Sequence, residues 1–293
     1  MPQVSILGLV LGILLTGCGA STTTSGRPTS PRSSPGAVLS ATASGSATPM
    51  SSPVMTSAPP SPVPALEARL YGPVGLVFDA IGNLYVTQCT FDDGQSFIYR
   101  IDPGGLLVPF AGTGRLAFSG DGGQAASADI QCPAGIAFGP DGGLYFADHA
   151  NNRVRRIGKD GVITTVAGSG PAGVNVGSFA GDGGPAVHAR LQEPWGVAFD
   201  SDGNLFIADR DNDRVRRVDV HGVITTLAGS GRHGFAGDGG LAVKASLCGP
   251  QGLTFDSHGN LLIADDCNDR VRMVDRHGVI STYVGTGIRG LLW

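Results

Sequence analysis

One sequence pattern occurs four times along the chain, and this repetition constrains the fold more than any other feature. The most complete copy begins at Pro194 and reads PWGVAFDSDGNLFIADRDNDRVRRVDVHGVITTLAGSG, and related copies begin at Pro73, Pro133 and Pro250. Successive copies therefore start 60, 61 and 56 residues apart. A period of this length indicates a repeat architecture, in which each copy forms one supersecondary unit that packs against its neighbours.

Each copy predicts four short strands. In the copy that begins at Pro194, the expected strands cover residues 196–199, 205–208, 214–218 and 223–227. These runs are rich in β-branched and aromatic residues, and turn residues separate them. No intervening segment is long enough for a crossover helix, so each copy should form an antiparallel meander. Four-stranded meanders in tandem are typical of propeller blades, because each blade needs neighbours to cover its two faces.

The repeated motifs resemble the NHL repeat over about residues 66–287, through Pro-x-Gly-Val-Ala-x-Asp, Gly-Asn-Leu-Tyr-Ile-Ala-Asp and Asn-x-Arg-Val-Arg. Connectors with Phe-x-Gly-Asp-Gly-Gly, at Phe118, Phe179 and Phe235, resemble a bacterial lipoprotein form of this family. The resemblance implies a β-propeller, most often of six blades, that binds proteins or other ligands, while a minority of related propellers are enzymes. We therefore expect an all-β propeller domain at 66–293. Its four blades should cover about 73–114, 133–170, 194–231 and 250–287.

The number of copies departs from the family pattern. Four complete blades shaped for a six-blade ring would form an open arc or incomplete ring with two apolar end faces. Such faces favour self-association. Three alternatives remain open at this stage: an arc completed by a second copy, a closed ring of four blades, and a truncated fragment of a longer protein.

The N-terminus predicts export. Residues 4–15 form an apolar run of signal-peptide length that is too short for a membrane span. The following Leu-Thr-Gly-Cys resembles a bacterial lipobox, so we expect a signal peptide at 1–17 and lipidation of Cys18. Residues 18–65 are rich in Ser, Thr and Pro and predict a disordered tether. The protein should therefore be extracytoplasmic and lipid-anchored to the bacterial cell membrane.

The four remaining cysteines form an even set, which in an exported domain favours disulfides. Cys248 precedes the first strand of the fourth copy, and Cys267 follows its second strand, so the two should meet within one blade. Cys89 follows the second strand of the first copy, and Cys132 precedes the first strand of the second copy. This places a second candidate pair at the join between two blades. Free thiols are the alternative.

Charged residues recur at fixed positions and are expected to be structural. The arginines of each Arg-x-Arg pattern should pair with an aspartate that ends the second strand of the same copy. These residues are Asp148, Asp209 and Asp265, the first arginines Arg153, Arg214 and Arg270, and the second arginines Arg155, Arg216 and Arg272. The connector aspartates Asp121, Asp182 and Asp238 should cap local backbone amides in turns, or form a ring of carboxylates on one rim. A net charge of −4 with 6% aromatic residues excludes a nucleic-acid platform.

Residues that differ between copies are the candidates for ligand binding. His149, Arg210 and Asp266 follow the second strands at equivalent positions, and they do not form a metal-binding set. Phe91, Asp92 and Asp93 lengthen a loop in the first copy, and residues 171–178 lengthen one connector. The sequence lacks the common nucleophile-elbow, zinc-protease and phosphate-loop motifs, so we predict no catalytic residue, metal or cofactor.

These observations predict a membrane-anchored binding or scaffold protein whose propeller rim binds a protein or glycan. The alternatives are a propeller-type lyase or hydrolase with a central metal, and a truncated fragment of a longer NHL protein.

Overall fold

The computed structural model describes residues 61–90 and 95–288. The expected signal peptide, Cys18 and the tether up to residue 60 lie outside the described residues, as do Phe91, Asp92 and Asp93. Among the described residues, no helix is long and apolar enough to cross a membrane.

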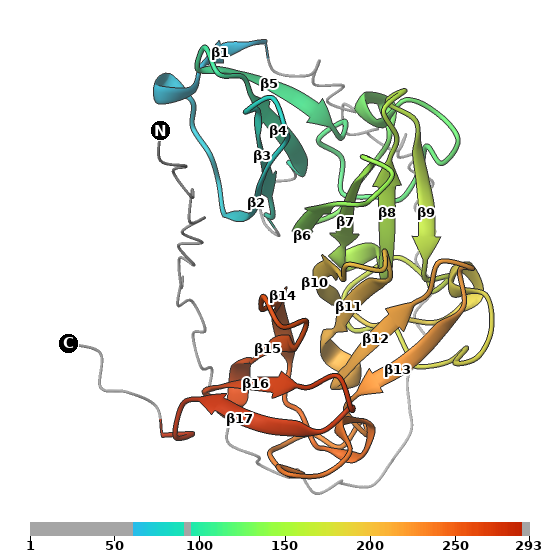
Figure 1. The fold of residues 1–293 in the computed structure, drawn as a ribbon. Helices are drawn as coiled ribbons and strands as arrows, with labels where there is room; N and C mark the ends of the chain where they lie inside the picture. Colours follow the sequence, from blue (N-terminus) through green and yellow to red (C-terminus); the bar gives the residue numbers. More distant parts are fainter. Residues whose placement is uncertain (1–60, 91–94, 289–293) are drawn as a thin grey trace, which may run out of the picture. The chain divides into compact units, whose positions relative to one another are not determined.

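Four antiparallel blades follow one another along the chain, as the repeats predict (Figure 1). Blade 1 contains β2 (Pro73–Phe78), β3 (Leu84–Gln88), β4 (Phe97–Ile101) and β5 (Leu106–Ala111). Blade 2 contains β6 (Pro133–Phe138), β7 (Leu144–Asp148), β8 (Arg153–Ile157) and β9 (Ile163–Ala167). Blade 3 contains β10 (Pro194–Phe199), β11 (Leu205–Asp209), β12 (Arg214–Val218) and β13 (Ile224–Ala228). Blade 4 contains β14 (Pro250–Phe255), β15 (Leu261–Asp265), β16 (Arg270–Val274) and β17 (Ile280–Val284).

Each connector leaves the fourth, outer strand of one blade and pairs with the outer strand of the next blade. In blade 1, β1 (Val63–Pro64) pairs with β5 and adds a fifth strand ahead of the expected domain start at residue 66. The later connectors make the same contact as single bridges, for example between Pro185 and Val223. Each connector then forms a short 3-10 turn and returns to an inner strand. These turns are η1 (Ala65–Glu67), η2 (Ala125–Ser127), η4 (Ala186–His188) and η6 (Ala242–Lys244).

The inner strands β2, β6, β10 and β14 lie next to one another in that order (Figure 1). The glycine of each Pro-x-Gly motif makes this possible. A Cβ atom on Gly135 would lie 2.6 Å from the carbonyl oxygen of Trp195, and one on Gly196 would lie even closer to the carbonyl oxygen of Gln251. Only a residue without a side chain allows two backbones to approach so closely.

Most of the hydrophobic core lies in three layers between consecutive blades, and a smaller cluster of Phe97, Tyr99 and Leu107 packs within blade 1. In blades 2, 3 and 4 the third residue of the second strand is fully buried in one of the three layers. Phe146 packs between blades 1 and 2, Ile207 between blades 2 and 3, and Ile263 between blades 3 and 4. Because every layer uses side chains from two blades, each blade is stabilised mainly by its neighbours.

The row of blades is open, so the structure excludes the closed four-blade ring. Leu76 and Phe78 of β2 are 55% and 66% exposed, whereas Ile136, at the position equivalent to Leu76, is 8% exposed. At the other end, Gly252 of β14 faces no neighbouring inner strand, and the nearest atom to a Cβ built there is 3.5 Å away on Ala264. Tyr283 and Val284 of β17 are 58% and 56% exposed, so apolar side chains are uncovered at both ends of the described domain.

The recurring aspartates pair with the second arginine of each motif. Arg155 is fully buried, with Nη1 3.3 Å from Oδ2 of Asp148 and Nη2 2.8 Å from Oδ1 of Asp121. The first arginine has a different structural contact, because the guanidinium of Arg153 lies 3.9 Å from the centre of the Phe118 ring. Blades 3 and 4 repeat both arrangements, with Arg216 and Arg272 in the ion pairs and Arg214 and Arg270 over phenylalanine rings.

The connector aspartates neither cap a local turn nor form a free ring of carboxylates, which corrects both sequence interpretations. Asp121 accepts hydrogen bonds from Nε and Nη2 of Arg155 and from the hydroxyl of Thr165. Asp182 makes the equivalent contacts in blade 3. In blade 4, Asp238 accepts from Nη2 of Arg272 and from the hydroxyl of Thr282, while the buried Nε of Arg272 has no hydrogen-bond partner in the described part of the chain. A buried guanidinium needs hydrogen-bond acceptors, and one connector carboxylate, one strand carboxylate and carbonyls of the connector supply most of them.

Both predicted cysteine pairs are disulfides. The Cα atoms are 4.0 Å apart in Cys89–Cys132 and 5.4 Å apart in Cys248–Cys267, within the reach of a disulfide. The first bond joins blade 1 to the residue that precedes blade 2, and the second lies within blade 4.

Candidate functional site

The second strands β3, β7, β11 and β15 all end at one edge of the blades, which we call the turn edge. In blades 2, 3 and 4 a short 3-10 turn follows the strand: η3 (His149–Asn151), η5 (Arg210–Asn212) and η7 (Asp266–Asn268). The predicted ligand-binding residues His149, Arg210 and Asp266 are therefore the first residues of the three turns. Each turn ends at a residue with positive φ, which aims the chain back into the third strand.

His149 forms the floor of the site between blades 2 and 3. Its ring is buried, with Nδ1 3.3 Å from the carbonyl oxygen of Pro194 and Nε2 3.6 Å from Oε2 of Glu193. Burial lowers the pKa of His149 to about 4, and the nearby Arg210 charge adds to this effect. At neutral pH the His149 ring is therefore uncharged.

Trp195 and Arg210 form the half-buried surface above this floor. The Trp195 ring stands edge-to-face on His149, with ring centres 4.9 Å apart. The Arg210 guanidinium lies 5.8 Å from the centre of the Trp195 ring, and its Nη1 is 2.8 Å from Oδ1 of Asp211 and 3.9 Å from Oε2 of Glu193. Burial raises the pKa of Asp211, and the Glu193 charge raises it further.

Glu193 ties the lengthened connector to this site. Oε1 of Glu193 accepts the backbone N–H of Asn175 at 2.6 Å, and the backbone N–H of Glu193 donates to Oδ1 of Asn152 at 2.8 Å. The side-chain amide of Asn152 also donates to the carbonyls of Pro171 and Gly173. The insertion at 171–178 is thus held against the turn edge by specific polar contacts.

Glu193 and Trp195 were not among the residues singled out from the sequence, although a signal was present. The position before the inner-strand proline is Gly72 in blade 1, Cys132 in blade 2, Glu193 in blade 3 and Gly249 in blade 4, and all four have positive φ. This conformation is costly for residues other than glycine. A buried glutamate held in this conformation therefore marks a specialised position.

Asp266 is exposed and belongs to a separate part of the turn edge. Its Oδ2 accepts a hydrogen bond from Nε2 of Gln251 at 2.9 Å. Gln251 and Asp266 occupy the positions that Trp195 and Arg210 hold in blade 3. The structure therefore brings His149 and Arg210 together, while Asp266 forms the corresponding pair of the next blade.

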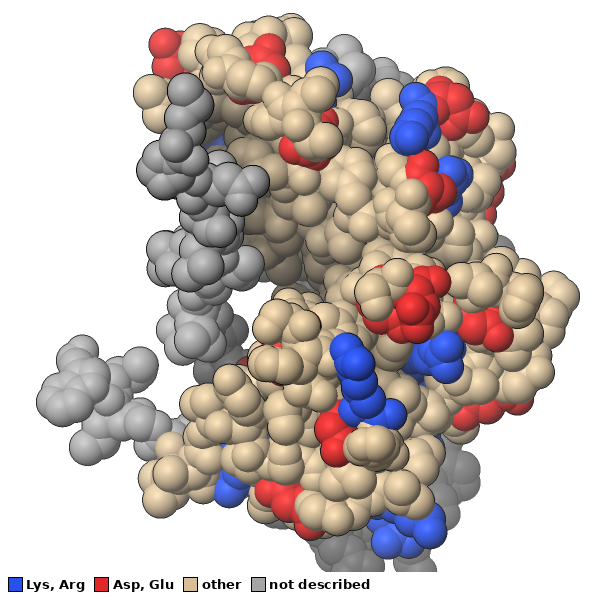
Figure 2. Space-filling model, in the orientation of Figure 1, with Lys and Arg blue, Asp and Glu red and all other residues tan. Residues whose placement is uncertain are grey.

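In the space-filling view, acidic and basic side chains alternate over the visible face without a large area of one sign (Figure 2). Within residues 61–90 and 95–288, the one group of three potential metal ligands is His233, Cys248 and Cys267, and two of these are joined in a disulfide.

A shallow hollow of about 490 Å³ lies on the outer side of blade 3. It is lined by Phe179, Asp182, Arg214, Thr226, Arg232 and Lys244, among others. Four of these belong to the repeated structural network, since Arg214 lies over Phe179, and Asp182 pairs with Arg216 and accepts a hydrogen bond from Thr226. The hollow is thus largely a product of the blade itself, unlike the His149–Trp195–Arg210 group.

Comparison with known proteins agrees with this architecture. A family model of the teneurin NHL domain matches residues 113–175, 175–236 and 233–290, more than half of the chain. The chain is similar to suppressor of quenching 1, a chloroplastic protein of Arabidopsis thaliana, with 33% identity over 147 residues that cover 49% of this chain and 14% of that protein. It is 30% identical to human teneurin-4 over 238 residues, covering 73% of this chain and 8% of that protein.

The chain therefore spans at most 14% of the length of these two relatives. Among solved structures, an auxiliary nutrient binding protein from Bacteroides ovatus superposes with a TM-score of 0.51 at 20% sequence identity, over 73% of this chain and 49% of that one. At this identity the likeness concerns the fold.

Proposed function

Because the chain belongs to the NHL-repeat family, we propose that it is an extracytoplasmic binding module, anchored to the bacterial cell membrane through Cys18, whose turn edge binds a protein or a glycan. The repeated residues of each blade are engaged in the buried ion pairs and the core. The residues that differ between blades gather at the turn edge. A scaffold with constant blades and a varied edge is the arrangement expected of a binding protein.

The observation that carries this proposal is the pair of half-buried side chains Trp195 and Arg210. Tryptophan and arginine are enriched among the residues that dominate binding free energy at protein interfaces. Here both are held in place from below, Trp195 by His149 and Arg210 by Asp211 and Glu193. Because their positions are already fixed before binding, a ligand that contacts them would lose less conformational entropy.

Site-specific photo-crosslinking in the producing bacterium tests a protein ligand. A benzophenone amino acid at position 210 should give a discrete crosslinked product, and the same amino acid at position 221 should not. His221 is the matched control, because it is exposed in a turn at the opposite end of the strands. The variant Trp195→Gln, which introduces the residue found at position 251, should remove the product while leaving the melting temperature close to wild type.

A glycan array with the purified chain tests the second ligand class. Binding to a defined set of glycans that Trp195→Gln abolishes would assign the turn edge to carbohydrate recognition. If position 210 gives no crosslink and no array glycan binds in a Trp195-dependent way, the binding role of this edge is wrong.

The open end faces support a second interaction, with another copy of the same chain. The outer side of blade 1, with Leu76 and Phe78, corresponds to the side of blade 3 that faces blade 2. The outer side of blade 4, with the exposed Tyr283, corresponds to the side of blade 2 that faces blade 3. The two faces are therefore complementary halves of the repeated blade contact. Sedimentation velocity should show concentration-dependent association that Phe78→Asp weakens, and a monomer at every concentration would contradict this part of the proposal.

A further inference from the structure

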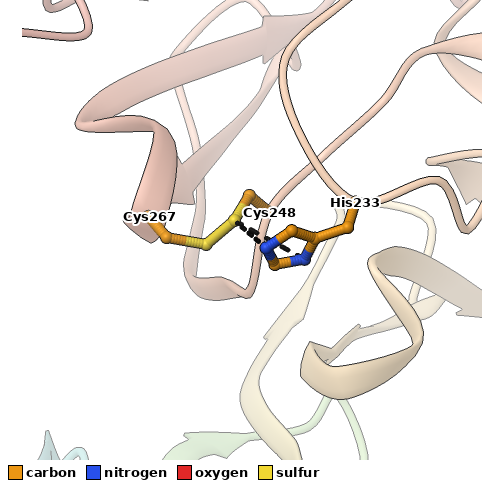
Figure 3. A group of neighbouring side chains, drawn as sticks. All are labelled: His233, Cys248 and Cys267. Carbon is orange, nitrogen blue, oxygen red and sulfur yellow. Dashed lines mark hydrogen bonds between the residues drawn. A yellow bond between two sulfur atoms is a disulfide. The ribbon is translucent and has the colours of Figure 1, made fainter. Parts of the chain in front are cut away.

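The Cys248–Cys267 disulfide differs from an ordinary structural disulfide in its surroundings (Figure 3). Cys248 is buried and Cys267 is exposed, so an incoming group reaches only one of the two sulfur atoms. A histidine ring lies against the buried sulfur, with Nε2 of His233 3.1 Å from Sγ of Cys248. The bond thus has one sulfur open to attack and a potential proton donor beside the other sulfur.

His233 is held in this orientation by Asp213. Oδ2 of Asp213 lies 3.1 Å from Nδ1 of His233, and Oδ1 accepts the backbone N–H of Gly249 at 2.9 Å. A carboxylate can only accept, so Nδ1 carries a proton and Nε2 is the nitrogen left for Cys248. Blade 2 has Asn152 at the position of Asp213, where the side-chain oxygen accepts the equivalent backbone N–H of Glu193. The carboxylate in blade 3 adds the contact that orients the histidine.

The other disulfide provides an internal comparison. Cys89–Cys132 joins two blades, and Cys132 is fully buried. In the described part of the chain, no histidine groups with these two cysteines as His233 does with Cys248 and Cys267. Cys248 and Cys267 also lie only 19 residues apart, within a blade that its own ladder already holds together. Opening this bond would therefore cost the fold less than opening Cys89–Cys132.

We propose that Cys248–Cys267 is a site of thiol–disulfide exchange with dithiols, in which His233 and Asp213 stabilise Cys248 as the leaving thiolate. A thiolate of the dithiol attacks Sγ of Cys267, and its electron pair forms the new S–S bond. The Sγ–Sγ bond breaks, and its electron pair leaves on Cys248, where Nε2 of His233 donates to the leaving sulfur a proton taken from the dithiol. A thiolate leaves faster when a neighbouring positive charge lowers its basicity.

The second thiol of the reductant completes the reaction. It attacks the mixed disulfide, forms the disulfide of the reductant and releases Cys267 as a thiolate. The protein gains two electrons and the dithiol loses two. The two thiol protons of the reductant end on Cys248, through His233, and on Cys267. The reverse reaction would reduce a disulfide of the partner to a dithiol and re-form the Cys248–Cys267 bond, without any other cofactor.

The exchange site lies on the turn edge, since Cys267 is part of η7 and Cys248 precedes β14. A protein that docks on this edge would bring its own thiols to the exposed sulfur. The exchange chemistry is nevertheless separate from docking, because a small dithiol reaches Cys267 without a partner. A test with dithiothreitol therefore leaves the proposed binding function untouched whichever way it ends.

The experiment follows the reduction of each disulfide in the purified, folded chain. The protein is exposed to dithiothreitol at neutral pH with EDTA present, so that metal ions do not occupy the His233–Cys248–Cys267 group. Free thiols are then alkylated and each cysteine peptide is quantified by mass spectrometry. We expect Cys248–Cys267 to be reduced roughly tenfold faster, or more, than Cys89–Cys132.

The variants separate the histidine effect from simple exposure of Cys267. His233→Ala should slow the reduction of Cys248–Cys267 roughly tenfold and leave the rate for Cys89–Cys132 unchanged. Asp213→Asn keeps the acceptor for Gly249, removes the charge beside His233, and should slow the reaction by a smaller factor. The side chain of His233 is 72% exposed, so its replacement spares the core. Equal rates for Cys248–Cys267 in wild type and His233→Ala would overturn the proposal, as would reduction of both bonds only on unfolding.

Discussion

Replacement of Arg216 by methionine tests the central claim about how each blade is held together. The Arg216 side chain is fully buried, with Nη1 3.2 Å from Oδ2 of the equally buried Asp209 and Nη2 2.7 Å from Oδ1 of Asp182. Methionine fills much of the same volume but leaves Asp209 without its positive partner. Breaking a buried pair in this way costs about 3–5 kcal/mol. For a domain of this size, such a loss corresponds to a fall in melting temperature of roughly 6–20 °C.

The loss should also depend on pH. Burial raises the pKa of Asp209 from 3.8 to about 6. The groups that donate hydrogen bonds to Asp209, which include Arg216, lower this pKa and so oppose part of the rise. Removing Arg216 raises this pKa further, because a positive neighbour favours the charged form. A group whose pKa is raised on folding contributes stability below its unfolded pKa, and loses it as the pH rises through the folded pKa. The deficit of Arg216→Met relative to wild type should therefore be small near pH 4 and grow between about pH 5 and 8.

Urea unfolding at several pH values measures this, with Arg156→Met as the control. Arg156 belongs to β8, the equivalent strand of blade 2, and its ion pair with Asp141 is partly exposed on both sides. Such a surface pair contributes about 0–1 kcal/mol. The double variant with Asp209→Asn should recover part of the lost stability and remove its pH dependence. The reasoning is refuted if Arg216→Met costs no more than Arg156→Met, or if its deficit is the same at pH 4.5 and pH 7.5.

Three further outcomes follow from the fold and the expected anchor. Gly196→Ala should cost about 1–3 kcal/mol in urea unfolding, because its Cβ meets the backbone of the next blade, whereas Gly252→Ala, at the same motif position on the open end, should be near neutral. Replacing Cys89 and Cys132 together by serine should lower the unfolding free energy by about 2–4 kcal/mol under non-reducing conditions. Cys18→Ser should abolish labelling with palmitate and move the protein from the membrane fraction to the medium. Retention in the membrane fraction would contradict the lipid anchor.

The blades could be predicted because each copy contains the information for its own sheet. The turn glycine Gly203 has positive φ between two apolar strands, and its equivalents Gly142 and Gly259 do the same in blades 2 and 4. The strand β1 could not be predicted, because two residues show no alternation of apolar and polar side chains. Its pairing depends on where the connector meets β5, which is a property of the assembled blade.

Sequence spacing alone could not predict which arginine of each motif pairs with the strand aspartate. Arg153 lies directly opposite Asp148 in the strand register, so spacing alone makes it the natural partner. Arg155, two residues further along the strand, forms the ion pair instead. The carbonyls of Ser119 and Asp129 and the carboxylate of Asp121 also accept hydrogen bonds from its guanidinium. These acceptors come from the connector, whose path is not visible in the repeat.

The same reasoning explains why the turn edge is the part of this molecule that is free to specialise. The position occupied by Trp195 is Ala134 in blade 2 and Gln251 in blade 4, and all three blades keep the same strand geometry. The buried arginine network is built on the last residue of the second strand, which in blade 3 is Asp209 paired with Arg216, and this ion pair does not involve the side chain at position 195. Blade 4 uses this freedom differently, with Cys267 at the position of Asp211. One constant frame therefore supports a binding surface in one blade and a reactive disulfide in the next.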